Sequence, residues 1–99
     1  MNEEKILNLV GLAIKAGKAT KSASLTINEI KRGEVLLVLM EEGLTTDSAR
    51  QIKNKCSFYG IPLIDTLKNG SLKKATGGIL NNVTGILDKG IKESILKLQ

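Results

Sequence analysis

Apolar side chains recur at the spacing of an α-helix in four segments of the chain. In the first segment they fall within an arc of about 160°, which is typical of a helix that buries one side. The third segment carries Ala49, Ile52, Cys56 and Tyr59 on its apolar side. The four predicted helices cover residues 3–16, from 22 or 24 to 33, from 45 or 46 to 59, and from 88 or 89 onward, and a helix of one or two turns is expected at 71–76.

Between the helices lie short apolar runs that predict strands. Residues 35–40 are continuously apolar, as in a central strand buried on both faces. Residues 61–67 and 83–87 predict two more strands, and residues 19–21 have room only for a link or a single rung. Helices that alternate with strands predict one domain over residues 1–99: an α/β/α sandwich in three layers around a four-stranded, largely parallel or mixed sheet.

Composition narrows the kind of protein. The chain has 41% hydrophobic and 25% charged residues, which is ordinary for a globular domain. With one Phe, one Tyr and no Trp, its core must be aliphatic, and the same scarcity argues against modules that stack bases on a sheet of aromatic side chains. A single cysteine without histidine excludes an internal disulfide and a Cys/His zinc site. The acidic N-terminus is unlike a signal peptide, so we expect a cytoplasmic location.

The sequence offers little for catalysis. Without histidine there is no Ser-His or Cys-His pair, and Cys56 lies on the apolar side of its predicted helix. Glu41, Glu42 and Asp65 have no partner group at a required spacing and are expected at solvated ends of strands. The glycines at 77 and 78 lack the spacing of a nucleotide-binding loop. We therefore expect no enzyme activity, no metal and no cofactor.

Positive charge is concentrated between Gly17 and Gly33. This segment contains four cationic residues and one acidic residue, Glu29, so its net charge is +3 of the formal +5 of the whole chain. The cationic residues are Lys18, Lys21, Lys31 and Arg32. One interpretation is an ordinary solvated helix face. The other is an anion site, because a helix N-terminus attracts phosphate and two of the lysines precede it. Leu25 stands out as an apolar residue on the polar side of this helix.

These segments also resemble a known family. G-K-A-T-K-S-A-S at 17–24, E-V-L-L-V-L-M-E-E at 34–42 and A-R-Q-I-K-N-K-C at 49–56 are similar to the ribosomal protein L-seven-Ae/L-thirty-e superfamily. G-L-A-I-K-A-G-K at 11–18 has the shape of its bacterial YlxQ-type branch. The resemblance implies an α/β/α sandwich that binds kink-turn RNA, an internal loop with sheared G·A pairs and a sharp backbone bend. In that family two segments contact the RNA: the start of the second helix and a loop before the last strand.

The family's helix motif, G-x-N-E-x-x-K, can be placed by counting back from Gly33. Its glycine, Asn, Glu and Lys then fall on Ser22, Ser24, Leu25 and Asn28. Leu25 cannot accept the hydrogen bonds that the family's Glu takes from a guanine edge, and Asn28 brings a neutral amide where the family has a cation. The family's small apolar loop maps onto Gly78, Ile79, Leu80 and Asn81, where the two aliphatic residues are either buried or in contact with the ligand.

The leading hypothesis is a non-enzymatic protein that binds kink-turn or similarly structured RNA, with ribosome association as part of that role. Lys18, Lys21 and Arg32 would bind phosphates, and the motif positions and the loop would shape the contact. The alternative is a protein-docking module that uses the same face on a ribosomal or regulatory partner. We expect no membrane and no DNA as partners.

Overall fold

The computed structural model describes the chain from Met1 to Gln99, which forms five helices and three strands. They are α1 (Glu3–Lys15), α2 (Ala23–Lys31), β1 (Leu37–Glu41), α3 (Asp47–Tyr59), β2 (Leu63–Leu67), α4 (Ser71–Ala75), β3 (Val83–Ile86) and α5 (Lys89–Leu96). The predicted order of the five helices and of three strands is therefore confirmed. No helix is both long enough and apolar enough to cross a membrane.

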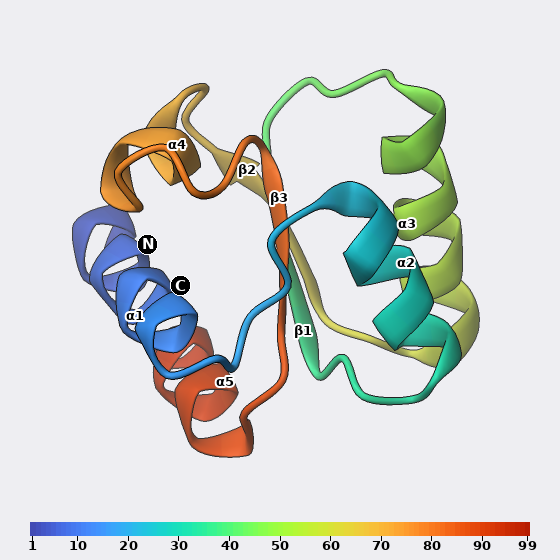
Figure 1. The fold of residues 1–99 in the computed structure, drawn as a ribbon, viewed down its shortest axis with the longest axis horizontal. Coiled ribbons are helices and arrows are strands. Elements are labelled where there is room, and N and C mark those ends of the chain that lie inside the picture. Colours follow the sequence, from blue (N-terminus) through green and yellow to red (C-terminus); the bar gives the residue numbers. More distant parts are fainter.

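The strand β1 separates two packed clusters. All five of its residues are buried, and successive side chains point to opposite faces. Leu37 and Leu39 pack with α1, α4 and α5, whereas Val38 and Met40 pack with α2 and α3. Figure 1 shows the three layers that result, with α1, α4 and α5 on one face of the sheet and α2 and α3 on the other.

The sheet has three strands in the order β2-β1-β3, so the prediction of four strands is wrong. β1 pairs with β2 in parallel and with β3 antiparallel, which makes the sheet mixed. In place of a fourth strand, Ala19 forms a single antiparallel bridge with Ile86. The chain cannot extend the pairing there because Ser22 already caps α2.

A buried hydrogen-bond chain fixes the link before α2. The Gly85 N–H donates to Thr20 Oγ1 (2.7 Å), and Thr26 Oγ1 donates to the carbonyl oxygen of Ser22 (2.8 Å). Because the Thr26 hydroxyl proton is used, Thr20 Oγ1 must donate to Thr26 Oγ1 across their 2.6 Å contact. A Cβ at Gly85 would come within 3.2 Å of Thr20 Oγ1, so glycine permits this close approach. The start of α2 is thereby tied to β3.

Glu41 was expected at a solvated end of a strand, and this prediction is wrong. Its side chain is buried, and its carboxylate accepts the N–H groups of Gly70 (2.9 Å) and Leu72 (3.2 Å). Those groups lie at the start of α4, whose N-cap residue, Gly70, has no side chain to accept them. Glu41 therefore holds α4 against the end of β1 and has a structural role.

On α3, one predicted apolar position differs from expectation. Ala49, Ile52 and Cys56 are buried as predicted, but Tyr59 is exposed. The helix ends at Tyr59 and the chain turns toward β2, so that Ile61 packs against the buried cluster instead. Burial also raises the pKa of the Cys56 thiol from 9.0 to about 11, which makes it a poor nucleophile.

Replacing Thr20 by Val should destabilise the fold by about 1–3 kcal/mol, because the buried Gly85 N–H loses its acceptor while the side-chain shape is kept. The free energy of unfolding from urea titrations measures this. Thr45→Val is the control: Thr45 is exposed and makes no side-chain hydrogen bond, so a change within about 0.5 kcal/mol is expected. Equal effects of the two substitutions would contradict the role of Thr20.

Candidate nucleic-acid interface

Ser22 begins α2 and satisfies only part of its first turn. Its Oγ accepts the Leu25 N–H (3.1 Å), and its carbonyl oxygen accepts the Thr26 N–H (2.9 Å). The N–H groups of Ala23 and Ser24 donate to no protein atom. Of the two starts predicted for this helix, at residue 22 or at residue 24, the structure has the first, with Ser22 as the N-cap. Two unpaired donors therefore remain at the positive end of this helix.

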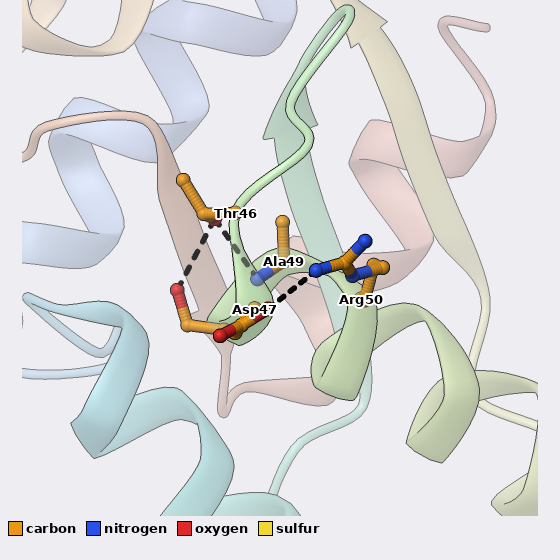
Figure 2. A network of polar contacts seen from close by, with 5 residues as sticks. Thr46, Asp47, Ala49 and Arg50 are labelled. Atoms are coloured by element: carbon orange, nitrogen blue, oxygen red, sulfur yellow. Dashed lines mark hydrogen bonds and ion pairs between the residues drawn. The ribbon is translucent and has the colours of Figure 1, made fainter.

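The start of α3 repeats this arrangement. Thr46 Oγ1 accepts the Ala49 N–H (3.2 Å) and lies 3.3 Å from Ser48 Oγ, and the Thr46 carbonyl oxygen accepts the Arg50 N–H (3.1 Å). Figure 2 shows this cap together with the ion pair between Asp47 and Arg50. The N–H groups of Asp47 and Ser48 have no protein acceptor.

Both helix starts border one hollow of about 380 Å³, which we call the α2–α3 pocket. The turn that follows α4 forms its remaining wall. Its lining contains two lysines and no carboxylate: Lys21, Ser22, Ala23, Thr46, Ser48, Lys73, Gly78, Ile79, Leu80, Asn81, Asn82 and Val83. Two residues with unpaired backbone N–H groups, Ala23 and Ser48, and two lysines thus line a space whose lining includes no carboxylate.

The loop after α4 presents one aliphatic side chain and buries the next. Thr76 Oγ1 donates to the Leu72 carbonyl oxygen (2.8 Å) and accepts the Leu80 N–H (3.0 Å), while the glycines at 77 and 78 take left-handed backbone angles (φ of 60° and 90°). Leu80 is therefore drawn into the core and is only 1% exposed, whereas Ile79 is 51% exposed. Of the two alternatives left open for these residues, burial therefore holds for the side chain of Leu80, although Leu80 is still among the residues that line the pocket.

Leu25 lies over a second hollow, of about 490 Å³, on the other side of the link before α2. Lys21 lines both hollows and joins them into one surface. Leu25 is exposed, as predicted. Arg32 borders the same groove from the far end of α2, where its guanidinium donates to Glu29 (2.8 Å).

The remaining predicted residues are exposed but line neither hollow. Lys18 precedes the link, and Ser24 and Asn28 lie on the outer side of α2, with Ser24 Oγ 3.2 Å from Ser22 Oγ. Sequence reasoning missed the pocket residues outside the family motif and its loop, among them Thr46, Ser48, Lys73 and Asn82. The sequence predicted a helix start at residue 45 or 46, but only the packing of α3 beside α2 brings the cap, Thr46, to the same pocket.

The layered fold, with a helix start and a glycine loop beside it, is the arrangement expected of the L-seven-Ae/L-thirty-e superfamily. The chain is 28% identical over 97 residues to the RNA-binding protein YlxQ of Enterococcus faecium, covering 98% of this chain and 93% of that protein. It is likewise 28% identical over 90 residues to the RNA-binding protein YlxQ of Bacillus subtilis, covering 91% of this chain and 90% of that one. No protein-family model matches the chain.

Two solved structures have a fold similar to that of this chain. A protein of unknown function from Bacillus halodurans superposes with a TM-score of 0.84 at 26% identity, over 95% of both chains. The 15.5 kD RNA-binding protein of Giardia lamblia shares the fold, with a TM-score of 0.74 at 19% identity over 99% of this chain and 87% of that one. The resemblance to YlxQ-type proteins is confirmed, and the Giardia protein has the same fold.

The two adjacent aliphatic residues of the loop should respond differently to truncation. Leu80→Ala should lower the free energy of unfolding by about 2–5 kcal/mol, because it leaves a cavity in the core. Ile79→Ala should change it by no more than about 0.5 kcal/mol, since the side chain faces solvent. Urea titration of both variants tests this, and a similar loss in each would mean that Ile79 is part of the core.

Proposed function

We propose that this protein binds structured RNA without catalysing a reaction on it, and that the ligand is a kink-turn or a similarly bent RNA, as in a ribosomal particle. The observation that carries the proposal is the meeting of two helix N-termini and two lysines at the α2–α3 pocket, with no carboxylate in its lining. The names of the YlxQ relatives support RNA as the ligand.

Phosphate is the chemical group that this pocket suits best. Two residues of its lining, Ala23 and Ser48, have backbone N–H groups with no protein acceptor, and the neighbouring N–H groups of Ser24 and Asp47 are likewise unpaired. Oriented donors at a helix start bind anions, and Lys21 and Lys73 add full charges beside them. A bent RNA backbone brings several phosphates close together, which one helix start alone could not exploit.

The apolar and amide groups of the same surface suit a nucleobase. A volume of about 380 Å³ is near the lower end of the range for small-molecule sites, about 300–1,000 Å³. Ile79 offers an apolar contact to the face of a base, and the amides of Asn81 and Asn82 lie beside it as hydrogen-bonding groups. The pocket therefore has room and chemistry for one unstacked nucleotide.

The residues on the outer side of α2 suit recognition of the shape of an RNA, and they lack the groups with which the family motif recognises a particular base. Leu25 has no hydrogen-bonding group for a guanine edge, whereas Ser24 and Asn28 keep a hydroxyl and an amide at the solvent. We propose that Lys18, Lys21 and Arg32 bind the backbone while Leu25 packs against a base. This division favours affinity for a bent shape over strict sequence specificity.

A kink-turn RNA should bind at least about tenfold more tightly than a duplex of equal length, a difference of about 1.4 kcal/mol. Fluorescence anisotropy titrations at two or more salt concentrations measure both affinities. Lys21→Ala and Lys73→Ala should each reduce the slope of log affinity against log salt by about 1. Lys5→Ala, in the opposite helical layer, is the charge-matched control and should leave the slope for the kink-turn nearly unchanged. Equal affinity for the two RNAs would reduce the protein to a nonspecific polycation.

Leu25→Glu should raise the ratio of kink-turn to duplex affinity, because a carboxylate at the motif position can accept hydrogen bonds from guanine worth about 1–3 kcal/mol. The ratio is the measured quantity, since added negative charge weakens binding to any RNA. Leu25→Gln is the neutral control of similar size and should raise the ratio less. An unchanged ratio would remove Leu25 from the RNA contact and favour the alternative function, docking of a protein partner on this face.

A further inference from the structure

The only two aromatic residues of the chain lie next to each other on its surface. Phe58 is 82% exposed and Tyr59 is 55% exposed, at the C-terminal end of α3. A core built from aliphatic side chains leaves both rings outside it. Two adjacent solvent-facing rings form a larger apolar patch than the single exposed residues that are normal on a protein surface.

Helix phase explains why Phe58 points outward. It follows the buried Cys56 by two residues, a rotation of about 200° around the helix. It therefore lies on the solvent side of α3, one helical turn after Asn54. Tyr59 lies one turn after Lys55 and closes the helix before Gly60. Neither ring has a stabilising role in the core that would account for its presence.

The two rings form the wall of a shallow hollow with hydrogen-bonding groups beside it. Their centroids are 4.9 Å apart and their planes meet at 88°, an edge-to-face pair. In such a pair the edge of one ring covers a face of the other, and other ring faces stay free for a further partner. The hollow measures about 460 Å³ and is lined by Gln51, Asn54, Lys55 and the two rings.

Charge around the hollow favours a polyanion. From residue 51 to residue 64 the chain holds two lysines, Lys53 and Lys55, and no acidic residue. The nearest acid before it, Asp47, is already paired with Arg50. Aromatic rings beside a cation and side-chain amides are the groups that bind unpaired nucleotides, since a ring stacks on any base and amides reach its edge.

We infer that Phe58 and Tyr59 stack on an unpaired base of the bound RNA, with Lys55 on its phosphate and the amides of Gln51 and Asn54 at its edge. The inference rests on the proposed function and adds a second contact to it. Phe58 follows Ser48, which lines the α2–α3 pocket, by ten residues of α3, so the two contacts lie about 15 Å apart along the helix. A single-stranded segment that leaves the structured part of the RNA can therefore occupy it.

Two RNAs test the inference: a blunt-ended kink-turn, and the same kink-turn with an unpaired adenosine tail of about eight nucleotides on either strand. The tail should tighten binding to the unaltered protein roughly five- to hundredfold. Phe58→Ala and Tyr59→Ala should remove most of this gain and leave the affinity for the blunt RNA unchanged. Because both side chains are exposed, neither substitution should unfold the protein.

Phe58→Trp supplies an independent signal. It keeps a stacking face, so the gain from the tail should be retained, and the fluorescence of the only indole should fall when tailed RNA is added but not with blunt RNA. Leu12→Ala, which removes an exposed aliphatic side chain from α1, is the control and should leave the gain unchanged. A tail that adds no affinity, or a gain that survives both alanine substitutions, overturns the inference and leaves the pair as a contact for protein.

Failure of the proposed function gives a different result. In that case the blunt kink-turn and the duplex bind alike, and the titration is repeated with a single strand of about eight adenosines alone. A loss of indole fluorescence in the Phe58→Trp variant supports the aromatic contact, whereas unchanged fluorescence overturns it as well.

Discussion

The burial of β1 on both faces is the constraint on which the rest of the structure depends. A strand that is covered on both sides requires two helical layers, and its alternating side chains divide the core into two clusters. The helices of each layer must then lie against the same short sheet, which brings the starts of α2 and α3 together. The position of the candidate site follows from how this strand is covered.

Polar groups buried at the ends of the strands give that surface its detailed shape. The hydrogen-bond chain through Thr20 holds the link before α2 against β3, and Glu41 holds α4 at the end of β1. Thr76 then folds the following loop so that Ile79 points outward. None of these groups is in the lining of the α2–α3 pocket, yet each positions a segment that is. These three residues therefore support the pocket from outside its lining, whereas Ser22 and Thr46 both cap a helix and line the pocket.

Periodicity was sufficient to predict the helices and the central strand, because burial of one face or of both faces leaves a direct pattern in the sequence. The positions where the structure differs from the prediction lie at the ends of helices and strands. Tyr59 has the right helical phase for the core but lies beyond the layer it would pack on, and the segment at Ala19 pairs for only one rung. Ile79 and Leu80 are both branched aliphatic residues, so their sequence does not say which is buried. The Thr76 hydrogen bonds fold the loop so that Leu80 is buried and Ile79 is exposed. The role of Thr46 at the pocket required a contact between helices that no local pattern encodes.

The bond between Thr20 and Gly85 joins residues 65 positions apart. Contacts of such long range form late, because the entropy of closing the loop must be met before they contribute. During synthesis the link before α2 cannot be fixed until β3 has left the ribosome, although α2 itself is made in the first third of the chain. The surface that we propose for RNA is therefore completed only after β3 has been made, long after α2 itself.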